Sequence, residues 1–251
     1  MNLAIIVLAG GKGTRIKPVL GNTPKILAPI AGKSFLEWFL EWIKGWKLDI
    51  NPDIFLSTCI GHDEIENFCK SKNLNLKCVR EDRPLGTFGA IANVASNFAY
   101  CHYLVLNGDT IFEADLKLVY ENFKKDELKR PMIILKESKN NERYGGYKLI
   151  KNGWIYTKNR TPFISMGAFF ISAKELKKRW VRRTNIPFDS IAINKLIKSE
   201  IMIDKDCFGE EPIRATKLKS GISFLDIGIP SSYNISQTYI PSFFKNLINE
   251  K

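Results

Sequence analysis

Short apolar runs alternate with longer segments of helical spacing over the first 130 residues. The first run, residues 3–9, is wholly apolar and predicts a strand that is buried on both faces. A helix is expected directly after Ser34, which can cap it, because apolar residues recur there at intervals of three and four. We expect further strands at residues 54–58, 76–80 and 103–106 and further helices at about 63–72 and 87–99. This alternation predicts parallel strands in one sheet with helices on both of its faces.

After about residue 130 the alternation of apolar runs with helical segments becomes less regular. Four strands are expected without long helices between them, at residues 131–136, 146–150, 154–157 and 166–171. Helices should follow at 173–183 and 188–199, and then a strand pair and a strand at 222–226. A mixed or antiparallel extension of the sheet is therefore expected. No linker rich in Pro, Gly or Ser separates the halves, so we predict a single Rossmann-like α/β domain over residues 1–251, with its active site between the two halves.

Charge and composition narrow the function classes only partly. The net charge of +12 fits a nucleic-acid binder and equally an enzyme with phosphorylated substrates. No recognition helix, aromatic stacking motif or zinc finger supports nucleic-acid binding. The apolar run at residues 3–9 is too short to span a bilayer and lacks the features of a signal peptide, so we expect a cytoplasmic protein without a membrane partner.

Cysteine and histidine offer no chemistry of their own in this chain. The five cysteines are odd in number and lack CxxC spacing, which argues against a disulfide framework and a zinc site and favours buried free thiols. His62 is expected in a loop and His102 at the start of a strand, both without catalytic context.

A glycine-rich loop with several cations directly follows the first predicted strand. Such loops expose backbone N–H groups that can cradle phosphates. The dinucleotide fingerprint GxGxxG would begin at Gly11 but finds Ile16 in place of its third glycine. The phosphate loop GxxxxGK[ST] would end in Gly32-Lys33-Ser34 but has Leu27 where its first glycine belongs. Neither of these two motifs explains the loop.

The pattern that does match is L-A-G-G-x-G-T-R, from Leu8 to Arg15, followed ten residues later by Pro24-Lys25. With it the chain resembles the sugar-1-phosphate nucleotidyltransferases, or NDP-sugar pyrophosphorylases. The resemblance implies that Arg15 and Lys25 are catalytic. Arg15 offers a planar fork of donors to a triphosphate, and Lys25 a compact charge to the reacting α-phosphate. The loop residues implied to bind the nucleotide are Leu8, Ala9, Gly10, Gly11, Gly13 and Thr14.

A second segment, residues 84–90, resembles the family's P-L-G-T-x-G-A motif, which closes over the nucleobase. Gly86 and Thr87 are implied to bind the nucleotide. The position three residues before the proline, which reads the base edge in the family, holds Glu81. A carboxylate can accept hydrogen bonds from both N1–H and the 2-amino group of guanine, which favours GTP. Glu81 as a solvated strand-end charge, and CTP, UTP or dTTP as the nucleotide, remain open.

Two aspartates match the family's metal ligands. Asp109 lies in Leu-Asn-Gly-Asp-Thr just beyond a predicted strand, and Asp226 lies in Asp-Ile-Gly-Ile-Pro. In isolation each would be read as a cap or turn residue. Together they imply a Mg²⁺ cofactor, because two carboxylates with phosphate oxygens and waters suit this small hard cation.

The resemblance spans nearly the whole chain and is most similar to the heptose-1-phosphate guanylyltransferases, short members without a C-terminal β-helix. It implies a nucleotide-binding half at about residues 1–130 and a sugar-phosphate-binding half at about 131–251. The acceptor pocket departs from the family pattern: Gly145 of its Y-G motif is present, but Thr157-Lys158 replaces E-K, and Ser165-Met166-Gly167 replaces N-A-G. Gly145 and Lys158 remain the candidates for the sugar phosphate, and the acceptor's identity stays open.

The implied reaction is nucleotidyl transfer from an NTP, in the first place GTP, to a sugar 1-phosphate of heptose or mannose type. Its products are an NDP-sugar for surface glycan synthesis and pyrophosphate. A different base, a phosphorylated acceptor that is not a sugar, and a non-catalytic nucleotide-sugar sensor are the alternatives, and a homodimer is left open.

Overall fold

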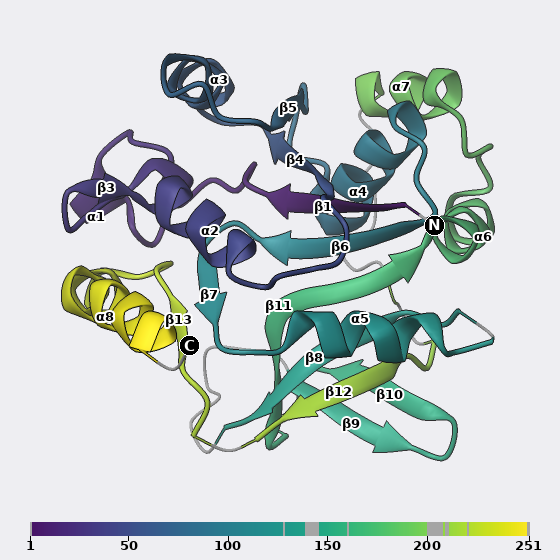
Figure 1. Ribbon diagram of the computed structural model, residues 1–251. Coiled ribbons are helices and arrows are strands. Elements are labelled where there is room, and N and C mark those ends of the chain that lie inside the picture. The colour runs from purple at the N-terminus through teal and green to yellow at the C-terminus, as the bar shows by residue number, and fades with distance from the viewer. Residues whose placement is uncertain are drawn as a thin grey trace.

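A computed structural model describes residues 2–127, 129–138, 146–159, 161–199, 208, 211–219 and 221–249. Its centre is a seven-stranded sheet in the order β12-β8-β11-β6-β1-β4-β5 (Figure 1). The strands are β1 (Leu3–Leu8), β4 (Asp53–Thr58), β5 (Lys77–Arg80), β6 (His102–Asn107), β8 (Met132–Glu137), β11 (Phe163–Ser172) and β12 (Arg214–Leu218). Strand β11 is antiparallel to both of its neighbours, and the other pairs in the sheet are parallel. The prediction of a mixed sheet is confirmed.

Three separate two-stranded sheets accompany the seven-stranded sheet. They are β2 (Pro29–Ile30) with β3 (Lys33–Ser34), β7 (Thr110–Phe112) with β13 (Phe224–Asp226), and β9 (Gly146–Ile150) with β10 (Gly153–Thr157), each antiparallel. The β7–β13 pair joins segments more than a hundred residues apart and places Asp226 opposite Thr110. It thereby brings the second predicted aspartate next to the first.

Helices cover both faces of the sheet (Figure 1). They are α1 (Lys17–Leu20), the 3₁₀ turn η1 (Lys25–Leu27), α2 (Phe35–Lys44), α3 (His62–Ser71), α4 (Gly86–Asn97), α5 (Leu116–Lys124), α6 (Ala173–Thr184), α7 (Ser190–Lys198) and α8 (Pro230–Asn249). Ser34 caps α2 as predicted: its Oγ accepts from the Glu37 backbone N–H, and its own N–H donates to the Glu37 carboxylate. None of the described helices combines the length and the apolarity needed to cross a membrane.

The wholly apolar first strand is explained by packing on both of its faces. Leu3, Ile5 and Val7 belong to the apolar core that includes α2, α5 and α8, whereas Ala4 and Ile6 belong to the core that includes α4, α6 and α7. This is the alternation expected of a central parallel strand. The fold is the Rossmann-like α/β type that the sequence predicts, and after β13 the described chain forms α8, with no β-helix.

Two smaller expectations are wrong. His62 is not in a loop but begins α3, where it is buried with its Nδ1 2.7 Å from Thr58 Oγ1. The cysteines are not uniformly buried, because Cys101 is exposed while Cys69 is buried; Cys207 lies outside the described residues. His102 does begin a strand, as expected.

Candidate active site

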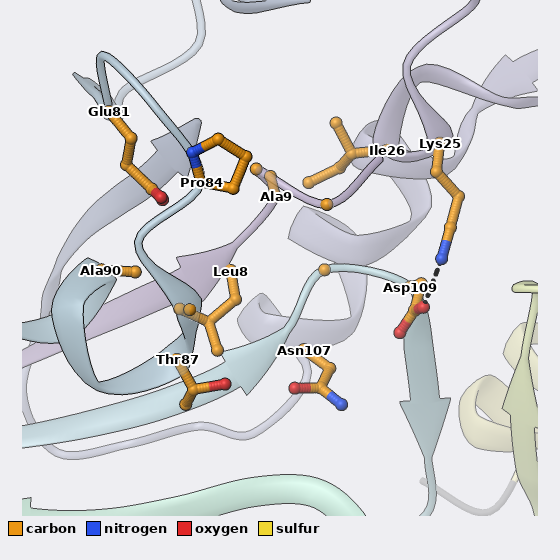
Figure 2. Close-up of a pocket in the computed structure, with 14 residues that line it drawn as sticks. Leu8, Ala9, Lys25, Ile26, Glu81, Pro84, Thr87, Ala90, Asn107 and Asp109 are labelled. Carbon is orange, nitrogen blue, oxygen red and sulfur yellow. Dashed lines mark hydrogen bonds and ion pairs between the residues drawn. The ribbon is translucent and has the colours of Figure 1, made fainter. Parts of the chain in front are cut away.

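A cavity of about 300 Å³ opens at the carboxyl ends of the parallel strands. β1 ends there at Leu8 and β6 at Asn107, and Figure 2 shows the residues that line it. Segments far apart in the sequence meet at this point because the strands that precede them are parallel neighbours. Nine of the predicted site residues line the cavity: Leu8, Ala9, Gly10, Gly11, Lys25, Glu81, Gly86, Thr87 and Asp109.

The glycine-rich loop reaches the cavity with its first half only. Gly13 has a φ of +58°, and its carbonyl accepts from the backbone N–H groups of Ile16 and Lys17, both at 3.1 Å. This turn directs the chain away from the cavity and into α1. Thr14 and Arg15 are exposed and lie outside the residues that line the cavity, as does Gly13 itself. The structure therefore does not bring Arg15 together with Lys25.

Lys25 extends from η1 toward Asp109 (Figure 2). Its Nζ donates to Asp109 Oδ2 at 2.7 Å, and the two side chains are only 20% and 22% exposed. The other carboxylate oxygen of Asp109 accepts from Thr110 Oγ1 at 2.9 Å. Asp109 is thus held from two sides, and the ammonium group of Lys25 lies at the cavity wall.

The position of η1 depends on a close approach between Pro24 and Gly61. Gly61 has a φ of +74°, and a Cβ placed on it would lie 2.5 Å from Pro24 Cγ. Only glycine accommodates both this backbone conformation and this contact. Pro24 directly precedes Lys25, so the turn before α3 sets the course of the chain that carries the lysine.

Glu81 is buried at the end of β5, with 5% of its surface exposed. Its Oε1 accepts from Ser57 Oγ at 2.8 Å, and its Oε2 accepts from the Leu85 backbone N–H at 3.0 Å. Burial raises the pKa of Glu81, and these two hydrogen bonds act in the opposite direction. Glu81 is therefore a buried carboxylate that lines the cavity, and not a solvated strand-end charge.

Asp226 lies at the end of β13 beside the Asp109 segment. The Ile227 backbone N–H donates to the Asp109 carbonyl at 3.0 Å, and Asp226 Oδ1 accepts from the Gly228 N–H at 2.6 Å. Asp226 does not itself line the cavity. Asp109 nevertheless directly precedes β7, whose first residue, Thr110, pairs with Asp226, so the two aspartates lie in neighbouring segments.

The predicted acceptor residues are less well placed. Lys158 is exposed just after β10 and outside the cavity lining, and Gly145 lies outside the described residues. The Ser165–Gly167 segment does approach the cavity. Gly167, with a φ of +71°, faces Asn107 so closely that a Cβ on it would lie 2.7 Å from Asn107 Nδ2.

Five residues that line the cavity were missed by the sequence reasoning although they lie in or directly beside the recognised motifs. Asn107 is the clearest, because its side chain lies in the cavity between Thr87 and Asp109 (Figure 2). The sequence could have indicated Asn107, since this residue directly precedes Gly108 and Asp109 at the end of a predicted strand. The other missed lining residues are Ile26, Pro84, Ala90 and Gly108.

The fold and the cavity together define a nucleotide-binding enzyme. The cavity lies at the strand ends of a mostly parallel α/β sheet and combines a glycine-rich loop, a buried carboxylate and a lysine–aspartate pair. The chain belongs to the nucleotidyl transferase family, whose family model matches residues 4–157.

Relatives and solved structures cover almost the entire chain. The D-glycero-alpha-D-manno-heptose 1-phosphate guanylyltransferase of Aneurinibacillus thermoaerophilus is 29% identical over 245 residues, covering 92% of this chain and 96% of the relative. The enzyme of the same name from Campylobacter jejuni is 28% identical over 237 residues, covering 91% and 96%. The crystal structure of HddC from Yersinia pseudotuberculosis has a TM-score of 0.67 and 27% identity, covering 97% of this chain and 100% of HddC. HddC complexed with GMP-PN also has a TM-score of 0.67, with 25% identity and coverages of 94% and 98%.

Proposed function

We propose that this protein transfers the guanylyl group of GTP to a heptose 1-phosphate and releases pyrophosphate. The observation that carries the proposal is the convergence of four separate segments on one cavity: residues 8–11, 25–26, 81–90 and 107–109. Residues 1–251 would act as one nucleotidyltransferase domain, with the nucleotide bound mainly by residues before about 130 and the sugar phosphate by those after it.

The proposed step is an in-line displacement at the α-phosphorus of the nucleotide. An oxygen of the sugar 1-phosphate forms the new P–O bond, the bond to the bridging oxygen of the β-phosphate breaks, and pyrophosphate leaves with that electron pair. Lys25 stabilises the charge on the α-phosphate, and Arg15 binds the triphosphate once the loop of residues 9–14 closes on it. Backbone N–H groups of Gly10 and Gly11 hold the nucleotide in place. No covalent enzyme intermediate is needed.

The residues present fit a divalent cation. Asp109, in the turn before β7, and Asp226, at the end of β13, offer oxygen ligands from neighbouring segments, which is the donor type that Mg²⁺ prefers. Among the described residues, no group of three or more His, Cys, Asp or Glu side chains forms a metal cluster. Mg²⁺ at nucleotide sites commonly needs only one or two carboxylates, since phosphate oxygens and waters complete its shell. The cation would supply charge neutralisation for the leaving pyrophosphate.

Guanine is favoured by the geometry of Glu81 and by two relatives named as guanylyltransferases. The two carboxylate oxygens of Glu81 have further lone pairs beyond those that accept from Ser57 and Leu85. These can accept from N1–H and the 2-amino group of guanine. The HddC structure in complex with GMP-PN agrees with a guanine nucleotide in this fold.

The acceptor is proposed from the relatives and from the position of β11. Gly167 leaves room for Asn107 where β6 and β11 meet, so the acceptor would lie on this side of the cavity. Gly145 and Lys158 would then have to reach its phosphate from the neighbouring segments. The relatives' names favour a heptose 1-phosphate over a mannose 1-phosphate.

A substrate matrix tests the proposal. Four NTPs are combined with heptose, mannose and glucose 1-phosphates, and pyrophosphate release is measured. GTP with the heptose 1-phosphate is expected to be turned over with a kcat/KM at least about tenfold above every other pair, the discrimination that one well-placed hydrogen bond supplies. Equal use of CTP or UTP would refute the guanine assignment. Nucleotide binding without any turnover would instead support a sensor.

The contact between Gly61 and Pro24 gives a second testable expectation. In Gly61→Ala the new Cβ should displace Pro24 and with it Lys25, and kcat should fall about tenfold or more, as small misplacements of reacting groups do. Gly32→Ala is the matched control, because Gly32 has a φ of +85° but nothing within 4 Å of its Cβ position. Both variants carry similar backbone strain, so equal kcat values in the two would contradict the positioning role of Gly61.

A further inference from the structure

Lys25 and Asp109 form an ion pair with each other, although the proposed reaction assigns a different partner to each of them. Lys25 is assigned to the α-phosphate and Asp109 to the divalent cation, yet here they bind each other at 2.7 Å. Lys25 is also the only cationic side chain among the residues that line the cavity. Its ammonium group therefore occupies one of the Asp109 oxygens that a metal would need.

We propose that Lys25 serves as a built-in cation for Asp109 until the nucleotide arrives, so that the site takes up the divalent cation together with the triphosphate and not alone. This inference rests on the proposed function, because it uses the roles assigned there to Lys25 and Asp109.

The competition follows from the oxygens that are available. Asp109 Oδ2 accepts from Lys25 and Asp109 Oδ1 from Thr110, and Asp226 Oδ1 accepts from the Gly228 N–H. A bare cation would have to displace the ammonium group and then lie beside a positive charge. The partial burial of the pair weakens solvent screening, which strengthens this repulsion.

The triphosphate removes the conflict. Its oxygens offer Lys25 an alternative anionic partner within the same cavity, and they also complete the ligand shell of the cation. The lysine stem is flexible, whereas η1, from which it extends, is anchored by the buried Ile26 and Leu27. The ammonium group can therefore move from carboxylate to phosphate without movement of the backbone. By linkage, the cation and the nucleotide each raise the affinity for the other.

Titration of nucleotide-free protein with Mn²⁺, followed by electron paramagnetic resonance of the free ion, tests this inference. Lys25→Met keeps the apolar stem and removes the charge. We expect it to bind Mn²⁺ at least about fivefold more tightly than the unsubstituted protein, a coupling at the lower end of the usual range. Lys17→Met is the matched control: Lys17 is an exposed cation at the start of α1 without an ion pair among the described residues, and its loss should change the affinity less than about twofold.

Two further variants make the result decisive. Adding Asp109→Asn to Lys25→Met should abolish the gain, because the carboxylate is then gone. Lys25→Gln repeats the test if Lys25→Met does not give a cooperative thermal unfolding transition. Equal affinities in the lysine variants and the unsubstituted protein, weaker binding in the variants, or no binding by either would overturn the proposal. The titration involves neither guanine nor an acceptor, so it stands even if the substrate matrix refutes the proposed substrates.

Discussion

Lys25→Met should lower kcat by about two orders of magnitude or more, the usual effect of removing one preorganised charge contact from a transition state. The charge of Lys25 lies on a short anchored turn at the cavity wall, where little reorganisation is needed to reach the α-phosphate. The KM for GTP should change much less, because under the proposed function most nucleotide contacts would come from other residues that line the cavity. Pyrophosphate release at saturating substrate measures the effect.

Stability should hardly change in this variant. A lysine–carboxylate pair with partly exposed side chains contributes about 0.2–1 kcal/mol, and Asp109 remains accessible to water when its partner is lost. Lys17→Met provides the comparison for a general change of charge, because Lys17 is exposed at the start of α1 and lies outside the loop of residues 9–14. If Lys25→Met and Lys17→Met had the same kcat, the catalytic role of Lys25 would have to be abandoned.

Hydrophobic periodicity predicted most of the fold, because the central strands are buried on both faces. Residues 3–9 could be assigned to a strand from their apolar run alone, and the structure ends that strand one residue earlier. Helix α2 was predictable from its spacing and from the Ser34 cap. Helix α5 was missed although Leu116, Val119, Tyr120 and Phe123 carry the same signal on its buried side. Strand β7, which precedes α5, has three residues, and a run of this length is too short to show the periodicity of a strand.

The cavity was predictable as a set of residues but not as a geometry. Motifs at strand ends indicated which residues would meet, since parallel strands end at one edge of the sheet. The pairing of Lys25 with Asp109 joins residues 84 positions apart, and no local pattern indicates it. The contact of Gly61 with Pro24 is equally hidden, because it depends on how two turns pack. The outward course of the loop at Arg15 depends on the turn at Gly13.

The acceptor side was the least predictable region, for a physical reason. Specificity for a sugar is carried by single hydrogen bonds from loops and strand ends, and the motif residues that would identify them are replaced here. Gly167 could be placed next to Asn107 only once β11 was seen to pair with β6 in antiparallel fashion. Sequence patterns place a strand, whereas the register of a mixed sheet decides which side chains face each other.

Glu81→Gln should remove the preference for guanine while leaving the fold intact. The glutamine oxygen can accept from the Leu85 N–H and its amide can donate to Ser57 Oγ, so both buried contacts can be kept. Since burial raises the pKa of Glu81, its ionised form opposes folding above the ordinary glutamate pKa. The neutral variant lacks this cost, and its Tm at neutral pH is expected to equal or exceed that of the unsubstituted protein.

Guanine, in contrast, would lose its acceptors. Its N1–H and 2-amino donors would face an amide that offers one oxygen already engaged and an NH₂ group, and a buried donor without an acceptor costs about 1–3 kcal/mol. The kcat/KM for GTP should therefore fall at least about thirtyfold. Inosine triphosphate, which lacks the 2-amino group, isolates one of the two bonds. The unsubstituted protein should prefer GTP over inosine triphosphate about tenfold, as expected for a hydrogen bond to a charged group, and in Glu81→Gln this ratio should approach one. If the ratio stayed the same in both proteins, Glu81 would support the cavity wall without contacting the base, and guanine recognition would have to come from the backbone of residues 8–11.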